Sequence, residues 1–243
     1  MPADPTLAVV NPGAAGGARA ELAALAASKQ TWSAPLRELP VGAATRPAAV
    51  LILFGVLDDR PSAHVAQDAA VSRDLDVLLL ARAETLRSHP GQVAFPGGRL
   101  DPGDDGPVGA ALREAQEETG LDPAGVEVLG TLDEVPLEHS GHLVTPVLGW
   151  WRHPSPVRVV DVAESADVFR APVADLLDPA HRGTTVLRRG GQTWRGPAFQ
   201  VNGHLVWGFT ALLLDALFDR LGWTEPWDRR RETPLPDLGD TGR

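Results

Sequence analysis

Three glutamates at helical spacing are the residues in this chain with the clearest chemical potential. Glu114, Glu117 and Glu118 stand at positions i, i+3 and i+4 of the segment 113–121, Arg-Glu-Ala-Gln-Glu-Glu-Thr-Gly-Leu. A helix would gather their carboxylates on one side, where each like-charged pair costs roughly a few tenths of a kcal/mol. The chain has no cysteine, so a metal there would have oxygen ligands, which suit magnesium or manganese. The triplet alone is more typical of a solvated acidic face.

The helix that must carry these glutamates has clear ends. We expect it over 107–119, because Asp104 and Asp105 are capping candidates, Pro107 suits a first turn and Gly120 can end it. Its apolar stripe consists of Val108, Ala111, Leu112 and Ala115. The acids fall beside this stripe. They are therefore expected at the boundary between core and solvent, where charge needs compensation.

The rest of the chain alternates strands and helices. Segments 48–56 and 76–82 are continuously apolar, which predicts strands buried on both faces, joined by a polar, exposed connection. Further strands are expected at 126–132, 142–151, 167–170 and 184–189. A last helix should run over 210–221, with Asp215 and Asp219 on its polar face. The pattern is that of an α/β protein.

The residues before the acidic helix turn the triplet into a recognisable signature. Phe95-Pro-Gly-Gly98 leads into it, and the combination resembles the Nudix box: Gly, five residues, Glu, seven residues, then Arg-Glu-apolar-any-Glu-Glu-any-Gly-apolar. The second half matches completely over 113–121. In the first half Asp105 takes the early acidic position and Gly98 lies one residue too far upstream. We attribute both departures to one extra loop residue, and we expect Asp105 to cap the helix instead.

The resemblance implies the Nudix fold, in which a mixed β-sheet is sandwiched between α-helices, and a metal-dependent hydrolase. It implies that Glu114, Glu117 and Glu118 bind Mg²⁺ or Mn²⁺ and that Arg113 orients a carboxylate. With these, Glu114 and Arg113 belong to the catalytic set.

In this family a loop often supplies an additional general base. Glu164, in Asp161-Val-Ala-Glu-Ser, is the first candidate, because it lies in a polar segment beside a predicted strand. Glu138 is the second candidate. Each is otherwise an ordinary surface carboxylate.

The segment 78–98 narrows the substrate. Its two leucines, its arginines five residues apart at Arg82 and Arg87, its glycine and its Phe-Pro-Gly-Gly resemble the coenzyme A pyrophosphatase subgroup, with Leu80 where that motif has Thr. Arginine binds phosphate bidentately, so Arg82 and Arg87 are candidate substrate contacts unless they pair with neighbouring acids. Gly97 and Gly98 would let the backbone approach the substrate closely.

The resemblance therefore favours hydrolysis of the diphosphate of coenzyme A or its derivatives to 3',5'-adenosine bisphosphate and 4'-phosphopantetheine or its acyl form. The alternative is the same chemistry on ADP-ribose, NADH or a nucleoside triphosphate. A further alternative, from a different class, is a catalytically silent Nudix module that senses a ligand.

Composition and sequence pattern also indicate the partners, the location and the domain organisation of the protein. The net charge of −10 argues against a nucleic-acid or membrane partner, and no signal or membrane-spanning segment is visible, so we expect a cytoplasmic protein. We expect a flexible leader at 1–18, in front of a short helix at 20–28, then one domain at 19–227 and a polar tail at 228–243. A homodimer is implied by the resemblance alone.

Overall fold

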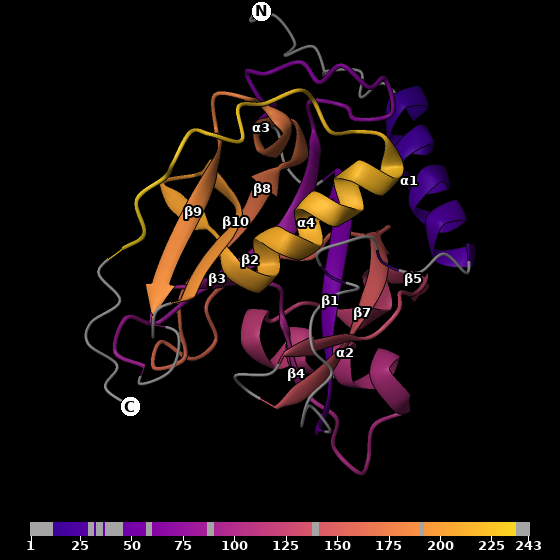
Figure 1. Cartoon of the computed structure of the whole chain (residues 1–243). Coiled ribbons are helices and arrows are strands. Elements are labelled where there is room, and N and C mark those ends of the chain that lie inside the picture. Colours follow the sequence, from indigo (N-terminus) through magenta and orange to yellow (C-terminus); the bar gives the residue numbers. More distant parts are fainter. Residues whose placement is uncertain are drawn as a thin grey trace, which may run out of the picture.

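A mixed β-sheet forms the centre of the structure (Figure 1). The computed structural model describes residues 12–28, 32, 36, 46–56, 60–86, 90–137, 141–189 and 192–236. Within these residues the sheet has eight strands in the order β3-β2-β1-β7-β5, with β4 on β1, β6 on β7 and β8 on β2. The strands are β1 Arg46–Val56, β2 Leu75–Arg82, β3 Val93–Ala94, β4 Gly97–Arg99, β5 Val126–Thr131, β6 Val135–Leu137, β7 His142–Trp151 and β8 Ser165–Pro172.

Strands β1 and β7 run parallel, whereas β2 and β4 pair antiparallel with β1. The sheet is therefore mixed, as the family resemblance implied. Strand β2 is buried over seven of its eight residues. A continuous apolar run in the sequence is typical of a strand that is buried on both faces.

Helices cover both faces of this sheet. Helix α2, Gly106–Thr119, packs on β1 and β4 through a small core that includes Ala49, Leu51 and Ala115. Helices α1, Pro12–Ala27, and α4, Gly208–Leu221, cover the opposite face together with the short α3, Val173–Leu177. Figure 1 shows α4 crossing the strands while α1 lies at the side of the molecule. No helix among the described residues is long and apolar enough to cross a membrane.

A second, three-stranded antiparallel sheet follows β8. It consists of β9 Arg182–Arg189, β10 Gln192–Val201 and β11 His204–Val206. Phe199, Val201 and Val206 pack into the same core as α4. Only β9 was predicted from the sequence, because the polar and glycine-containing segment 192–206 has no clean two-residue alternation.

Three expectations, two about the ends of the chain and one about an internal connection, were wrong. The first helix begins at Pro12, inside the proposed leader, and buries Ala18 and Leu22. The segment after residue 228 is not simply a solvated tail, because Thr184 exchanges backbone hydrogen bonds with Arg231 and Thr233. The connection between β1 and β2 is not fully exposed either.

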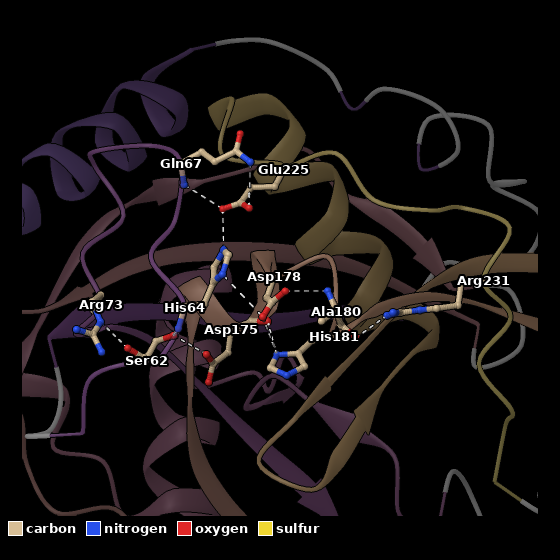
Figure 2. A network of polar contacts seen from close by, with 10 residues as sticks. All are labelled: Ser62, His64, Gln67, Arg73, Asp175, Asp178, Ala180, His181, Glu225 and Arg231. Atoms are coloured by element: carbon tan, nitrogen blue, oxygen red, sulfur yellow. Dashed lines mark hydrogen bonds and ion pairs between the residues drawn. The ribbon is translucent and has the colours of Figure 1, made fainter.

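That connection buries several side chains: Ser62, Ala70 and Val71. Its polar residues are divided, because Ser62 is folded onto a neighbouring element whereas Arg60, Gln67 and Arg73 are exposed. Ser62 donates a hydrogen bond to Asp175 at the start of α3 (Figure 2).

The predicted polar face of the last helix also needs correction. Asp215 is buried and bonded to Arg182 of β9, which is itself 1% exposed. The Arg182 guanidinium lies between the rings of Phe199 and Trp227, at 4.9 and 4.6 Å from their centroids. Burial lowers the pKa of Arg182 and raises the pKa of Asp215, and each partner opposes that shift in the other. The pair therefore joins the second sheet to α4, and each charge is stabilised in its buried position by the other.

Asp215→Asn should destabilise the protein by about 3 kcal/mol, because removing one charge leaves the other buried without compensation. Urea unfolding would measure the change. Asp219→Asn is the matched control: Asp219 is an exposed aspartate one turn further along α4, and its replacement should cost less than about 0.5 kcal/mol. Equal effects of the two substitutions would contradict the assigned role of the pair.

Candidate active site

Helix α2 is built as its sequence predicts, with one exception at its start. Pro107 lies in the first turn, and Gly120 ends the helix in the left-handed conformation at φ 71°, with its N–H bonded to Gln116. Asp105 stands at the N-cap position but makes no side-chain capping hydrogen bond and is exposed. The expectation that Asp105 caps the helix was therefore wrong.

The neighbouring Asp104 has the more important contact. Its two carboxylate oxygens accept hydrogen bonds from Arg113, from Nε at 2.9 Å and from Nη2 at 3.1 Å. This bond lowers the pKa of Asp104 and raises the pKa of Arg113 further above its ordinary value. Arg113 Nη2 also donates to the carbonyl oxygen of Arg99 at the end of β4. The sequence marked Asp104 only as a capping candidate.

Arg113 is thereby held where it reaches two of the glutamates. Its Nη1 lies 3.1 Å from Glu114 and 3.0 Å from Glu117. One guanidinium thus links the loop before α2, the end of β4 and the carboxylates of the helix. The orienting role that the resemblance implies for Arg113 stays a prediction.

Glu118 occupies the most costly environment of the three glutamates. Burial raises the pKa of Glu118 to about 7, with a smaller contribution from the charge of Glu114. The backbone N–H of Gly97 opposes this shift by donating a hydrogen bond of 2.9 Å to Glu118 Oε2. Burial also raises the pKa of Glu114, against the influence of Arg113. Two half-buried carboxylates therefore stand close enough to repel each other.

The two glycines of β4 make this approach possible. A Cβ atom on Gly98 would lie 2.4 Å from Glu114 Oε1, and one on Gly97 would lie 2.3 Å from the Ala49 carbonyl oxygen of β1. A side chain at Gly97 would push β4 away from the backbone of β1, and one at Gly98 would displace the Glu114 carboxylate. We predicted Gly97 and Gly98 as substrate contacts, and the structure gives each a packing reason that does not involve substrate.

A divalent cation fits the donor set, although the carboxylates are not preassembled around one point. Among the described residues, no three histidine, aspartate or glutamate side chains are arranged to hold an ion. The candidate ligands are all carboxylates, and their repulsion and partial burial leave a negative charge that a hard cation would relieve. Glu114 and Glu117 would exchange part of their contact with Arg113 for such an ion.

Two further predicted residues lie near this group. Arg82 ends β2 opposite Ser165, and Ala83 N–H donates to the carbonyl oxygen of Glu164 at 2.9 Å. The positive charge of Arg82 lowers the pKa of Glu118 and the charge of Glu164 raises it, so both side chains act on Glu118. Arg82 Nε is buried and has no hydrogen-bond partner within the described part of the chain. Arg87 and Glu138 lie outside the described residues.

Comparison with known proteins identifies the family of this chain. The NUDIX domain family matches residues 62–185, which include β2, the two glycines of β4 and all of α2. The chain belongs to the Nudix family. This Nudix chain is 40% identical over 147 residues to the "Uncharacterized Nudix hydrolase NudL" of Photorhabdus laumondii, covering 58% of the chain and 74% of that protein. Against the protein of the same name from Escherichia coli K12 it is 38% identical over 146 residues, 60% of the chain and 75% of that protein.

Solved structures include similar Nudix proteins. The Nudix hydrolase RenU of M. Smegmatis aligns over 76% of the chain and 90% of its own, with a TM-score of 0.47 and 20% identity. The Nudix domain of Shewanella oneidensis NrtR, solved with ADP ribose, covers 55% of the chain and 76% of its own, with a TM-score of 0.39 and 22% identity.

Glu118→Gln tests whether the carboxylate carries an uncompensated charge. In the folded protein the pKa of Glu118 is about 7, above the ordinary 4.5. Ionisation of Glu118 therefore lowers the free energy of unfolding as the pH rises from 4.5 to 7, and the loss is complete above pH 7. At pH 8, in chelator, the amide should therefore raise the free energy of unfolding by about 1–2 kcal/mol. Manganese should raise the melting temperature of the wild type but not of this variant. Equal manganese-induced shifts in both proteins would remove Glu118 from the metal ligands.

Proposed function

We propose that this Nudix chain hydrolyses the diphosphate bond of coenzyme A or its derivatives and requires magnesium or manganese. The observation that carries the proposal is Arg82. Its buried Nε lacks a hydrogen-bond partner among the described residues, and its charge lowers the pKa of Glu118 on α2. An anionic group beside a cation held by the glutamates of α2 would give this nitrogen a partner. The motif that contains Arg82 resembles that of the coenzyme A pyrophosphatases.

Glu114, Glu117 and Glu118 are the residues that would hold the ion. When bound, magnesium or manganese would neutralise the diphosphate and polarise the reacting phosphorus. Arg113, fixed by Asp104, restrains one carboxylate oxygen each of Glu114 and Glu117. The Gly97 N–H restrains Oε2 of Glu118.

The remaining residues bind the substrate and move a proton. Arg82 would hold a phosphate oxygen through its unpartnered nitrogen. Glu164, which acts electrostatically on Glu118 and is exposed, would accept a proton from the water that attacks phosphorus. The phosphoanhydride P–O bond breaks, and the two products are 3',5'-adenosine bisphosphate and 4'-phosphopantetheine, each with a terminal phosphate.

Product analysis tests the substrate. Purified protein should be incubated separately with coenzyme A, ADP-ribose and NADH, with manganese or with chelator, and the products separated by chromatography. We expect 3',5'-adenosine bisphosphate from coenzyme A, formed only with metal and faster than products from the other two. Preferential cleavage of ADP-ribose or NADH would reject coenzyme A but keep the metal site. Absence of cleavage would favour a silent ligand-sensing module.

Arg82→Lys should lower kcat/KM for coenzyme A by about 10- to 100-fold, because an ammonium group cannot reproduce the planar, two-pronged contact of a guanidinium with phosphate. The matched control is Arg195→Lys on β10, whose side chain is 48% exposed and paired with Glu232. This control should retain wild-type kinetics. Wild-type kcat/KM in Arg82→Lys would show that Arg82 does not contact the substrate.

A further inference from the structure

The guanidinium of Arg113 divides its contacts unequally between two sets of carboxylates. Its Nε and Nη2 atoms both donate to Asp104, at 2.9 and 3.1 Å, which is the two-pronged geometry that binds a carboxylate most strongly. Nη2 also donates to the carbonyl oxygen of Arg99 at 3.1 Å. Nη1 is the atom that faces the glutamates, at 3.1 Å from Glu114 Oε1 and 3.0 Å from Glu117 Oε2. Asp104, and not a glutamate of α2, therefore occupies a two-pronged edge of the guanidinium.

Asp104 is held in place by its own turn as well as by Arg113. The Asp101 N–H donates to Asp104 Oδ2 at 2.7 Å, and the Asp104 N–H donates to the Asp101 carbonyl oxygen at 3.0 Å. The Asp104 side chain is only 6% exposed, whereas the Asp101 side chain, whose Oδ2 lies 3.7 Å from Arg113 Nη2, is 67% exposed. The loop thus fixes the Asp104 carboxylate partly through contacts that do not involve the guanidinium. Asp104 can therefore determine where Arg113 lies.

The adjacent Asp105 differs from Asp104 although the two side chains carry the same charge. Asp105 takes the early acidic position when residues are counted back from Arg113. Its side chain is nevertheless exposed and makes no capping hydrogen bond with α2. The loop before α2 thus presents Asp104, and not Asp105, to the guanidinium.

Release of Arg113 from Asp104 would change the competition for the glutamates. Glu114 and Glu117 each have one carboxylate oxygen beside Nη1. Without Asp104, Nε and Nη2 could turn toward the same carboxylates, because a guanidinium pairs readily with carboxylates through two parallel hydrogen bonds. Arg113 and Glu117 also stand at i and i+4, a spacing at which side chains of a helix meet. A divalent cation would then have to displace a stronger competitor from these oxygens.

We propose that Asp104 is a positioning residue of the metal site: it holds a two-pronged edge of Arg113 away from Glu114 and Glu117, so that a divalent cation can take their carboxylates. The inference rests on the proposed function in one respect, since it takes the glutamates of α2 as the ligands of the ion. It does not depend on which diphosphate is cleaved. It gives a role to an acid in the loop before α2, outside the segment 113–121.

Manganese binding to the full-length protein, without substrate, provides the test. Electron paramagnetic resonance of free manganese would give the dissociation constant. In Asp104→Asn this constant should rise at least about tenfold, because an uncharged amide with one acceptor oxygen cannot hold two N–H groups of Arg113 as a carboxylate does. Asp105→Asn is the matched control, since it removes the same charge one residue away. Its dissociation constant should stay within about twofold of the wild-type value.

A second background separates positioning from a general effect of charge. In Arg113→Gln there is no guanidinium to redirect, so adding Asp104→Asn should change the manganese dissociation constant by less than about twofold. The melting temperature of each variant in chelator would show that it is folded. A positioning role therefore predicts that the effect of Asp104→Asn depends on Arg113.

The outcomes separate this inference from the proposed function. Wild-type manganese binding by folded Asp104→Asn would overturn the inference, and so would equal weakening in Asp105→Asn or in the Arg113→Gln background. If replacing Glu114, Glu117 and Glu118 together by glutamine leaves manganese binding unchanged, the proposed metal site falls and the inference falls with it. If the predicted pattern of manganese binding is found but coenzyme A is not cleaved, the substrate assignment falls and the positioning role of Asp104 stands.

Discussion

Repulsion among carboxylates on one helix is the interaction around which the active-site half of this fold is organised. Glu114 and Glu118 are half-buried, burial raises the pKa of both, and the charge of Glu114 raises the pKa of Glu118 further. The Arg113 guanidinium contacts Glu114 and the Gly97 N–H donates to Glu118, and these two contacts offset part of the cost of ionising them. Both depend on β4 lying close to α2, where a Cβ at Gly98 would displace the Glu114 carboxylate.

Local sequence signals predicted the elements that position this site. The helix ends marked by Pro107 and Gly120 were confirmed, and the strand predicted at 142–151 agrees with β7. The continuous apolar runs of β1 and β2 were also read correctly, since burial on both faces leaves no polar alternation. These features depend on neighbours in sequence, so periodicity and capping residues report them. The family signature added the roles of the glutamates, which remain proposals.

Contacts between distant segments were not predictable in the same way. Asp215 stands on the side of α4 that looks polar in sequence, and only the arrival of Arg182 from β9 makes its burial tolerable. Asp104 and Asp105 are indistinguishable as capping candidates until the loop sets one of them beside Arg113. The sequence of the β10–β11 hairpin has no strong alternation of polar and apolar residues. Its strands pack against α4, which is distant in sequence, so the local pattern did not predict them. In all three cases the observed conformation depends on contacts with segments that are distant in the sequence.

The most direct test of the central claim is to locate the metal itself. A crystal of the protein grown with manganese and a non-hydrolysable diphosphate would reveal the ion by anomalous scattering. We predict a peak within about 2.3 Å of carboxylate oxygens from at least two of Glu114, Glu117 and Glu118, with a phosphate oxygen completing its coordination. A manganese peak bound to other residues, with these glutamates still held by Arg113 and Gly97, would contradict the assignment of α2 as the metal-binding helix.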